Sequence, residues 1–405
     1  MSQRYYAQIS PGLEEGLARE LKTLGARRRQ ISRGGVSFEG TKKHLYRALH
    51  WSRLASRVWV TIAEGSAPNP DALFQRARRA PWASYLSATD QLSIKVALHG
   101  GSLAGSGQVE SVLWSAIKSS LNTQGIPAPK RGAWGDPQTT QRVLAYLHSG
   151  RVELRVDGSG ELLHRRGWRT QDGPAPLRPT LAWACLEALD WRPDEPLIDL
   201  MCGAGTFSME ALSASLHVPP RRRVHYACMS WPSFDPASWD AQGEPSHPPL
   251  FQRNEAETNP ELTRRHWVSD LAEESLSLAR AHLSTIAVGS QLKIIYTRAD
   301  ATALTSSALS SLWEREAPPP SGLIIANPPY GLRVEDQATG GLSVAQRLCD
   351  ALPEMVPDQA TSWRAGVLLP SAMALKTPPG WAKREALAFS HGGIPVSLWR
   401  LQPSI

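Results

Sequence analysis

The sequence predicts an α/β protein in which a parallel sheet with helices on both faces follows a smaller, basic α+β region. Three observations carry this prediction. From Leu181 onward, helical and strand-like apolar segments alternate along the chain. The apolar run 197–200 contains an acid near its end and leads directly into a glycine-containing turn and a helical stretch. The apolar run 323–326 leads into Asn-Pro-Pro-Tyr, so a second polar turn stands where a buried strand ends.

The two halves of the chain differ in charge. Residues 1–170 contain 25 Lys and Arg against 12 Asp and Glu, whereas residues 171–405 contain 19 against 25. Arginine outnumbers lysine 35 to 9, and arginine is the better bidentate and stacking partner for phosphates and bases. A genome of high GC content also favours arginine. The asymmetry indicates a nucleic-acid partner for the first half, with a merely solvated basic surface as the alternative.

Length and cysteine usage narrow the class of protein. At about 150 residues per domain, 405 residues predict two or three domains. The four cysteines have no paired spacing, so we expect neither a metal site nor a disulfide framework. No apolar stretch reaches the length of about 20 residues that spans a bilayer, and the N-terminus lacks a signal-peptide pattern. We therefore expect a cytoplasmic protein that makes no membrane contact; the oligomeric state is not readable from the sequence.

The first half begins with a strand and a helix. Alternation of Tyr5, Ala7 and Ile9 predicts a strand, and leucines 13, 17, 21 and 24 lie on one face of a helix that ends at Gly25. A short strand at 36–40 and a helix from 42 to about 54 follow. Further along, strands are expected near 92–98 and 152–156, with a helix near 109–121. These elements predict small α+β modules.

The composition changes between residues 158 and 179. Gly158-Ser159-Gly160 precedes an arginine-rich segment, His164 to Arg169, and a Gly-Pro-Ala-Pro stretch follows. We place a domain boundary at this hinge. Residues from about 216 to 260 interrupt the later alternation with Pro, Trp and Arg, which predicts an insertion or a long loop.

The glycine-containing turn after residues 197–200 is the candidate cofactor loop. Gly203 and Gly205 allow a ligand to approach the backbone closely, and the following helix presents N–H donors. The turn lacks the third glycine of a dinucleotide fingerprint and the Gly-Lys-Ser/Thr of a phosphate loop. The candidate cofactor-binding residues here are Asp199, Cys202, Gly203, Gly205, Thr206 and Phe207.

Acids at three strand ends favour one cofactor over others. The carboxylate of Asp199 suits the ammonium group of a methionine moiety and repels a pyrophosphate, so S-adenosylmethionine fits better than NAD. Asp270 ends the next strand, where an acid often holds ribose hydroxyls. Asp300 and Ala301 follow a third strand, and the acid there is a candidate acceptor for the adenine amino group. For Asp270 and Asp300, helix N-capping is the alternative role.

The turn Asn327-Pro328-Pro329-Tyr330 is the candidate catalytic motif. Two prolines stiffen the backbone, so the Asn327 amide oxygen and the Pro328 carbonyl stand ready to accept N–H groups. Tyr330 is placed to stack on a base, and Asn327 is also a candidate cofactor contact. This arrangement suits methylation of an exocyclic amino group. Any such string can also be a simple turn.

Over residues 175–405 the chain resembles the class I S-adenosylmethionine-dependent amino-methyltransferases. The resemblance rests on the order of the motifs: the acid with its glycine loop, the two further acids, and then the Asn-Pro-Pro-Tyr turn. With the first half included, the chain resembles the bacterial THUMP-domain RNA guanine-N2 methyltransferases. The motifs that carry the resemblance are 11–15, 35–40, 53–58, 81–82, 157–169 and 175–177. One departure is Val268-Ser269, where the family usually has a glycine before its second acid.

The resemblance implies three domains and a function. They are a ferredoxin-like domain at 1–57, a THUMP RNA-binding domain at 58–160, and a Rossmann-like methyltransferase domain at 161–405 that ends in an antiparallel hairpin. The implied reaction methylates the N2 amine of a guanine in structured RNA, with 23S ribosomal RNA the first choice and transfer RNA the second. Hinge residues Arg165, Arg166 and Arg169 are candidate phosphate contacts, with capping or bridging of domains as the alternative.

Other functions stay open at this point. The Asn-Pro-Pro-Tyr motif also occurs in enzymes that methylate the amino groups of adenine and cytosine in DNA. The resemblance of the first half to RNA methyltransferases argues against a DNA substrate. Methylation of a protein glutamine would not need the basic half. An RNA-binding assembly factor without catalysis is the alternative outside enzymes, and the intact Asp199, Gly203, Gly205 and Asn327 weigh against it.

Overall fold

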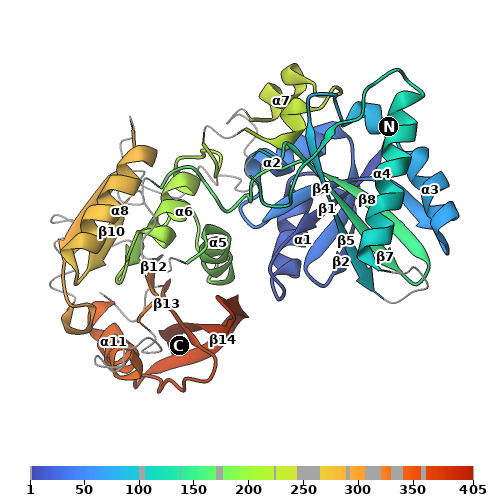
Figure 1. Cartoon of the computed structure of the whole chain (residues 1–405). Helices are drawn as coiled ribbons and strands as arrows, with labels where there is room; N and C mark the ends of the chain where they lie inside the picture. The colour runs from blue at the N-terminus through green and yellow to red at the C-terminus, as the bar shows by residue number, and fades with distance from the viewer. Residues whose placement is uncertain are drawn as a thin grey trace. The chain divides into compact units, whose positions relative to one another are not determined.

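The structure is a computed structural model, and it describes residues 2–99, 105–136, 138–169, 177–222, 225–243, 265–288, 292–305, 321–329, 341–356 and 362–404. The chain divides into two compact units (Figure 1). Unit 1 comprises Met1–Ile9, Leu17–Arg165 and Arg223–His247, and unit 2 comprises Ser10–Gly16, Arg166–Arg222 and Pro248–Ile405. Among the described residues, no helix combines the length and the apolar character that crossing a bilayer requires.

Unit 1 is built on one continuous eight-stranded sheet with the order β2-β3-β1-β4-β8-β7-β5-β6. Its strands are β1 (Gln3–Gln8), β2 (Arg27–Ser32), β3 (Gly35–Gly40), β4 (Arg57–Ser66), β5 (Gln91–His99), β6 (Lys130–Arg131), β7 (Gln141–His148) and β8 (Arg151–Asp157). Its helices are α1 (Glu14–Thr23), α2 (Lys42–Trp51), α3 (Pro70–Arg78), α4 (Ser106–Asn122) and α7 (Pro236–Gly243).

Local sequence explains the elements of unit 1. Two glutamates occupy the first turn of α1, where their negative charge interacts favourably with the positive end of the helix dipole. Gly25 follows the helix with a φ of 87°, a value that favours glycine. The Asn69 side chain caps α3 by accepting from the Ala72 N–H at 2.8 Å, and Pro70 is its first residue. The strands and helices predicted for this half are therefore present, together with strands at 27–32, 57–66 and 141–148 that the sequence did not single out.

Strand β4 joins the two regions that the sequence analysis separated at residue 57. It pairs antiparallel with β1 on one side and with β8 on the other. The predicted boundaries at 57 and 160 stay predictions, but the strands on the two sides of residue 57 belong to one sheet. The predicted insertion contributes α7 to unit 1, where the Trp51 indole N–H donates to the Gln242 carbonyl at 2.7 Å.

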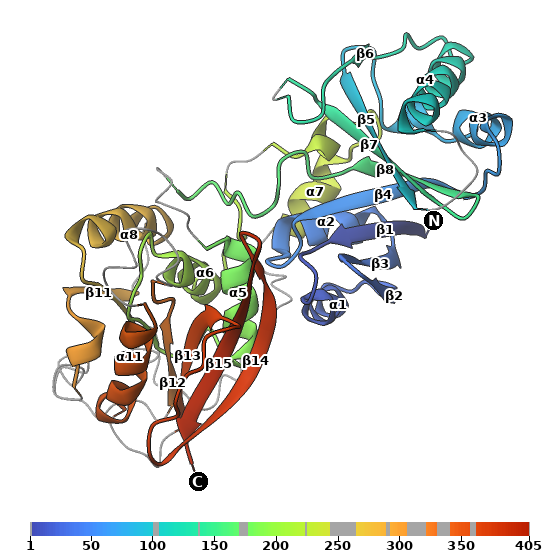
Figure 2. The ribbon, with the colours of Figure 1, turned by 60° about the horizontal axis from the view of Figure 1, so that its bottom comes forward.

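Unit 2 holds a seven-stranded sheet with the order β11-β10-β9-β12-β13-β15-β14. The strands are β9 (Leu197–Asp199), β10 (Arg265–Asp270), β11 (Lys293–Arg298), β12 (Ser321–Ala326), β13 (Ser362–Pro370), β14 (Trp381–His391) and β15 (Ile394–Pro403). Strands β9 to β13 are parallel, and β14 and β15 form the antiparallel hairpin that was expected at the end of the chain (Figure 2).

Helices cover both faces of the sheet in unit 2. They are α5 (Pro179–Ala188), α6 (Thr206–Ser215), α8 (Glu273–Ile286) and α11 (Gly341–Met355). One apolar cluster joins Ile198, Trp267 and Ile324 of the strands to leucines of α11. A second cluster joins Val268 to α6 and α8 on the opposite face. The α/β fold with a Rossmann-like sheet is thus confirmed.

Candidate active site

The candidate site lies where the strand order of unit 2 reverses. From β9, the chain builds β10 and β11 on one side and then crosses to build β12 and β13 on the other. The carboxyl ends of β9 and β12 are therefore neighbours, and a crevice at such a reversal is where open parallel sheets bind ligands. Asp199 pairs with Ile325, two residues before Asn327, so the acid and the Asn-Pro-Pro turn lie on adjacent strand ends.

Three contacts hold the glycine loop between β9 and α6. The Gly203 N–H donates to Asp270 Oδ2 at 2.9 Å. The Ala204 carbonyl accepts from His282 Nδ1 at 3.0 Å, which assigns the proton to Nδ1 because a carbonyl only accepts. A Cβ on Gly205 would stand 3.1 Å from the Ala279 Cβ, so the loop rests directly on α8.

The two glycines of this loop face different surroundings. Gly203 has a φ of 51° and Gly205 a φ of 77°, a region that side chains disfavour. A Cβ on Gly203 would meet none of the described residues within 4 Å, whereas one on Gly205 would press on α8. The loop therefore has an open side at Gly203 and a packed side at Gly205.

Asp199 is fully buried and only partly satisfied. The Ser208 hydroxyl donates to its Oδ2 at 2.7 Å, while Oδ1 has no hydrogen-bond partner among the described residues. Burial raises the pKa of Asp199 to about 7, and the nearby charge of Asp270 adds to this effect. A buried carboxylate oxygen without a partner is a fit for a cationic ligand group, which would restore its ionised form.

The second and third acids of the sequence analysis already serve the backbone. Asp270 accepts from Gly203 through Oδ2 and from the Ala272 N–H through Oδ1 at 3.0 Å. Asp300 accepts from the backbone N–H of Thr302 at 2.9 Å, and this bond lowers the pKa of Asp300. Asp300 is exposed and Ala301 is buried at the start of the short helix Ala301–Ala303. Both carboxylates keep lone pairs for a ligand.

The structure describes three of the four residues of the Asn-Pro-Pro-Tyr turn. Asn327 is half-buried, Pro328 is buried and Pro329 is exposed at the end of β12. Tyr330, the expected stacking residue, lies outside the described residues. The stacking role of Tyr330 therefore stays a prediction, as do the acceptor roles of Asn327 and Pro328.

The remaining loop residues occupy interior positions. Thr206 and Phe207 are buried in the first turn of α6. Burial strongly raises the pKa of the Cys202 thiol, which donates weakly to the Gly203 carbonyl at 3.5 Å. A protonated, inward-facing thiol is a poor nucleophile, so the Cys202 side chain fits a structural role in the loop.

The three hinge arginines have different environments. Arg165 is exposed. Arg166 is 5% exposed and makes a bidentate pair with Glu210 of α6, at 2.9 and 3.2 Å. Our expectation that Arg166 contacts an RNA phosphate is therefore corrected, because its guanidinium is enclosed in the domain and bound to a carboxylate.

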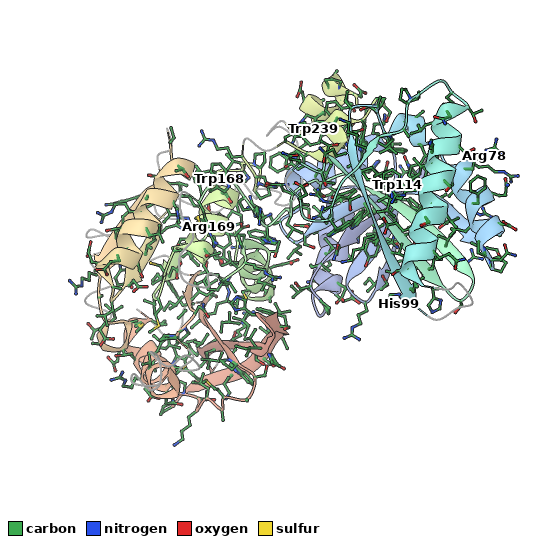
Figure 3. All side chains as sticks on the ribbon, in the orientation of Figure 1. Arg78, His99, Trp114, Trp168, Arg169 and Trp239 are labelled. Atoms are coloured by element: carbon green, nitrogen blue, oxygen red, sulfur yellow. The ribbon has the colours of Figure 1, made fainter. Side chains whose placement is uncertain are left out.

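Arg169 lies beside the glycine loop, at the start of α6 (Figure 3). Its Nη2 donates to the Thr206 hydroxyl at 2.7 Å and to the Leu177 carbonyl at 3.2 Å. The preceding Trp168 packs against α6 and α8 and donates to the Pro220 carbonyl at 2.8 Å. The Arg169 guanidinium is thus held at the N-terminus of α6. Both its positive charge and the positive end of the helix dipole would attract an anionic ligand group there.

Sequence reasoning missed the residues that support the loop. Ser208 and His282 are ordinary helix residues by pattern, and only their places on α6 and α8 bring them to Asp199 and Ala204. Ser269, at the departure from the family pattern, is fully buried and donates to the Leu200 carbonyl at 3.0 Å. The Ser269 carbonyl accepts from the Cys202 N–H at 3.0 Å, so a serine fits where glycine is usual.

The fold and this site define a methyltransferase domain of the Rossmann-like type. Residues 166–371, just over half of the chain, match the family model of the RMKL-like methyltransferase domain, and the chain belongs to this family. Residues 4–59 match the RlmL ferredoxin-like domain, which confirms a ferredoxin-like region at the N-terminus.

Individual relatives extend over the whole chain. A Synechocystis protein provisionally named an RNA methyltransferase is 29% identical over 406 residues, covering 98% of this chain and 96% of its own. The structure of SMU.472, a provisionally named methyltransferase solved with S-adenosylhomocysteine, has a TM-score of 0.73 at 21% identity and coverage of 100% and 99%. A Listeria monocytogenes protein named a predicted N6-adenine-specific DNA methylase has a TM-score of 0.77 at 22% identity and coverage of 98% and 96%. The two structures share the fold of this chain.

Proposed function

We propose that this protein transfers the methyl group of S-adenosylmethionine to the exocyclic N2 amine of a guanine in structured RNA, with 23S ribosomal RNA as substrate. The observation that carries the proposal is the pairing of Asp199 with Ile325, because it puts a buried carboxylate and the Asn-Pro-Pro turn on adjacent strand ends. Membership of the methyltransferase family and the RNA assignment in the name of the Synechocystis relative support it.

The strand ends around the glycine loop have residues of suitable chemistry for each end of the cofactor. The Asp199 carboxylate takes the ammonium group, since Oδ1 has no partner among the described residues. The Arg169 guanidinium, held at the start of α6, suits the carboxylate of the same amino-acid moiety better than it suits an RNA phosphate. The open side of Gly203 leaves room beside the loop, and Asp270 and Asp300 keep acceptors for ribose and adenine.

The Asn-Pro-Pro turn orients the amine. Bound S-adenosylmethionine supplies an activated methyl group on a sulfonium sulfur. The Asn327 amide oxygen and the Pro328 carbonyl accept the N–H groups of the guanine amine and so would direct its lone pair at that methyl group. Transfer forms the N–C bond, breaks the sulfonium S–C bond, and releases S-adenosylhomocysteine and one proton of the amine. Tyr330 stacks on the base once it is removed from its helix. Positioning and electrostatics therefore supply the catalysis, without a metal or a covalent intermediate.

Transfer RNA is the second choice of substrate. The charge of the first half, 25 basic against 12 acidic residues over positions 1–170, favours either RNA and does not separate them. A second candidate function is methylation of a DNA amine, which the name of the Listeria relative favours.

Mass spectrometry of nucleosides from fractionated RNA and DNA tests the proposal. A strain that lacks the gene is expected to lose N2-methylguanosine from one RNA fraction, and wild-type protein, but not Asn327→Ala, is expected to restore it. The expected fraction is 23S ribosomal RNA. An unchanged RNA profile, or loss of a methylated base from DNA alone, would contradict the proposal.

A further inference from the structure

Strand alternation gives the sheet of unit 1 two different faces. One face is apolar and buried, with Tyr5, Ala7, Val60, Val143 and Val156. The other carries aromatic and cationic side chains, because residues directly opposite in register project to the same side. In register, Tyr6 lies opposite Trp59, and Thr61 lies opposite Arg155. Tyr146 lies opposite Ala97. Lys95 and His99 are two residues before and after Ala97 on the same strand, so they project to the same side. We name this second set the aromatic face: Tyr6, Trp59, Lys95, His99, Trp134, Tyr146 and Arg155.

Rings and cations alternate across the aromatic face. The Arg155 guanidinium lies 3.9 Å from the ring centroid of Tyr6 and 5.8 Å from that of Tyr146. The His99 ring, at the end of β5 (Figure 3), lies 4.9 Å from the Tyr146 ring. A row of ring, guanidinium, ring and imidazole therefore runs across strands β1, β8, β7 and β5, held by cation–π and ring contacts.

Trp134 is the accessible ring of this face. It stacks on Trp59 with centroids 6.3 Å apart and planes within 15°. Trp59 is 2% exposed beneath it, whereas Trp134 is 40% exposed. The Lys95 ammonium, itself exposed, lies 5.4 Å from the Trp134 centroid. An indole supported on one side and open to solvent on the other, with a cation beside it, has the form of a stacking platform.

The charges of the face favour a polyanion. The register places four acids on this side of the sheet, and each is paired with an arginine. The pairs are Glu153 with Arg155 at 2.7 Å, Asp157 with Arg57, Glu64 with Arg4 at 2.7 Å and Glu39 with Arg28 at 3.3 Å. Lys95 has no carboxylate partner within salt-bridge distance among the described residues, and the first 170 residues carry a large excess of base. Aromatic rings interleaved with cations bind unpaired nucleotides, since bases stack on the rings and phosphates follow the cations.

We propose that the aromatic face binds an unpaired segment of the RNA substrate, with Trp134 stacking on a base and Lys95 contacting the adjoining phosphate. Paired bases hide their faces inside a duplex, so a free indole selects single-stranded RNA. This inference rests on the proposed function for its RNA partner, but the face lies in unit 1 and shares no residue with the methyl-transfer site in unit 2.

Fluorescence anisotropy with the full-length protein tests the inference, using a labelled single-stranded RNA of about eight nucleotides and a duplex of the same length. We expect tighter binding of the single strand. Trp134→Ala should weaken it about tenfold or more, since stacking on one ring contributes about 1–3 kcal/mol. Trp134→Phe should retain most of the affinity, and Lys95→Gln should weaken binding and lower its salt dependence.

Leu98→Ala is the matched control, because Leu98 is also 40% exposed and adjoins His99 on the same strand but points to the opposite side of the sheet. Its binding should equal that of the wild type. Unchanged affinity in both Trp134→Ala and Lys95→Gln, or preference for the duplex, would overturn the inference. Far-UV circular dichroism of the same variants shows whether unit 1 is folded, and calorimetry of S-adenosylhomocysteine binding separates this result from failure of the proposed methyl transfer.

Discussion

Ser208 donates a 2.7 Å hydrogen bond to Asp199 Oδ2, and Asp199 Oδ1, equally buried, has no partner among the described residues. One oxygen of the carboxylate is thus used to hold its orientation, and the other remains for a ligand. The arrangement is costly for the ionised form without a ligand, because burial raises the pKa of this group to about 7. A cationic ligand removes that cost.

Binding of S-adenosylhomocysteine should therefore depend on pH through Asp199. The group is mostly protonated at pH 6 and mostly ionised at pH 8, so affinity should rise about tenfold over this range. Asp199→Asn should bind weakly and without this rise, as measured by calorimetry.

The ligand-free protein should respond in the opposite direction. The pKa of Asp199 is higher in the folded than in the unfolded state, so its contribution to stability is present at low pH and is lost as pH rises through about 7. Asp199→Asn should remove this loss in urea unfolding.

The binding prediction has a separate contrary outcome. If the affinity of the wild type for S-adenosylhomocysteine did not change between pH 6 and pH 8, Asp199 would not bind the ammonium group.

Arg169→Met should weaken S-adenosylhomocysteine binding by about tenfold or more, because a charge-assisted bond to the ligand carboxylate is lost. Affinity for 5′-methylthioadenosine, which lacks the amino-acid moiety, should stay unchanged. Arg165→Met, at the exposed neighbour, is the control and should bind both ligands normally. Loss of RNA binding with normal binding of both ligands would instead assign Arg169 to phosphate.

Alanine substitutions at the two loop glycines should have different effects, one mainly on the free energy of unfolding and the other mainly on S-adenosylhomocysteine affinity. Gly205→Ala combines a φ of 77° with a 3.1 Å approach to Ala279, so it should lower the free energy of unfolding by more than Gly203→Ala does. Gly203→Ala adds a methyl group on the open side of the loop and should chiefly weaken S-adenosylhomocysteine binding. Urea unfolding and calorimetry on both variants give the comparison; equal binding losses at equal stability would contradict it.

Arg166→Met should destabilise the protein by about 3–5 kcal/mol, because it removes the bidentate, buried guanidinium partner of the Glu210 carboxylate. The double variant Arg166→Met with Glu210→Leu should recover most of this loss. Arg165→Met should change stability by no more than about 0.5 kcal/mol. If Arg166→Met were as stable as the wild type and lost RNA affinity, the interior role of Arg166 would be wrong.

Asn327→Ala should lower the rate constant of methyl transfer by about a hundredfold or more, since an acceptor that acts on the reacting amine is lost. Affinity for RNA should be retained, because the basic side chains of unit 1 are untouched. Single-turnover transfer of labelled methyl groups measures the effect. Full activity would remove the Asn-Pro-Pro turn from the mechanism.

The sequence predicted the fold of unit 2 well because its evidence is local. A buried strand such as 323–326 and its polar turn are contiguous in the chain, and the order of acids and glycines follows the order of the strands. The pairing that makes them a site is also regular, since parallel strands end at one edge. Asp199, the glycine loop and the Asn-Pro-Pro turn could therefore be placed together without a structure.

Contacts between distant side chains could not be predicted in this way. Nothing near Arg166 in sequence distinguishes it from Arg165, and its burial against Glu210 depends on how α6 packs. His282 is 78 residues from Ala204, so its hydrogen bond to the loop depends on the docking of α8. Both are consequences of tertiary packing, which a single sequence does not display.

The double pairing of β4, with β1 on one side and β8 on the other, has a consequence for how the chain can be divided. A fragment that begins at residue 58 would lack β1 and expose a row of unpaired backbone N–H and C=O groups along β4. Such an edge recruits other strands, so the fragment should self-associate, whereas a chain cut after the complete sheet would keep its edges short. The ferredoxin-like region therefore also pairs with the edge of β4, and we expect neither region to be stable when it is produced alone.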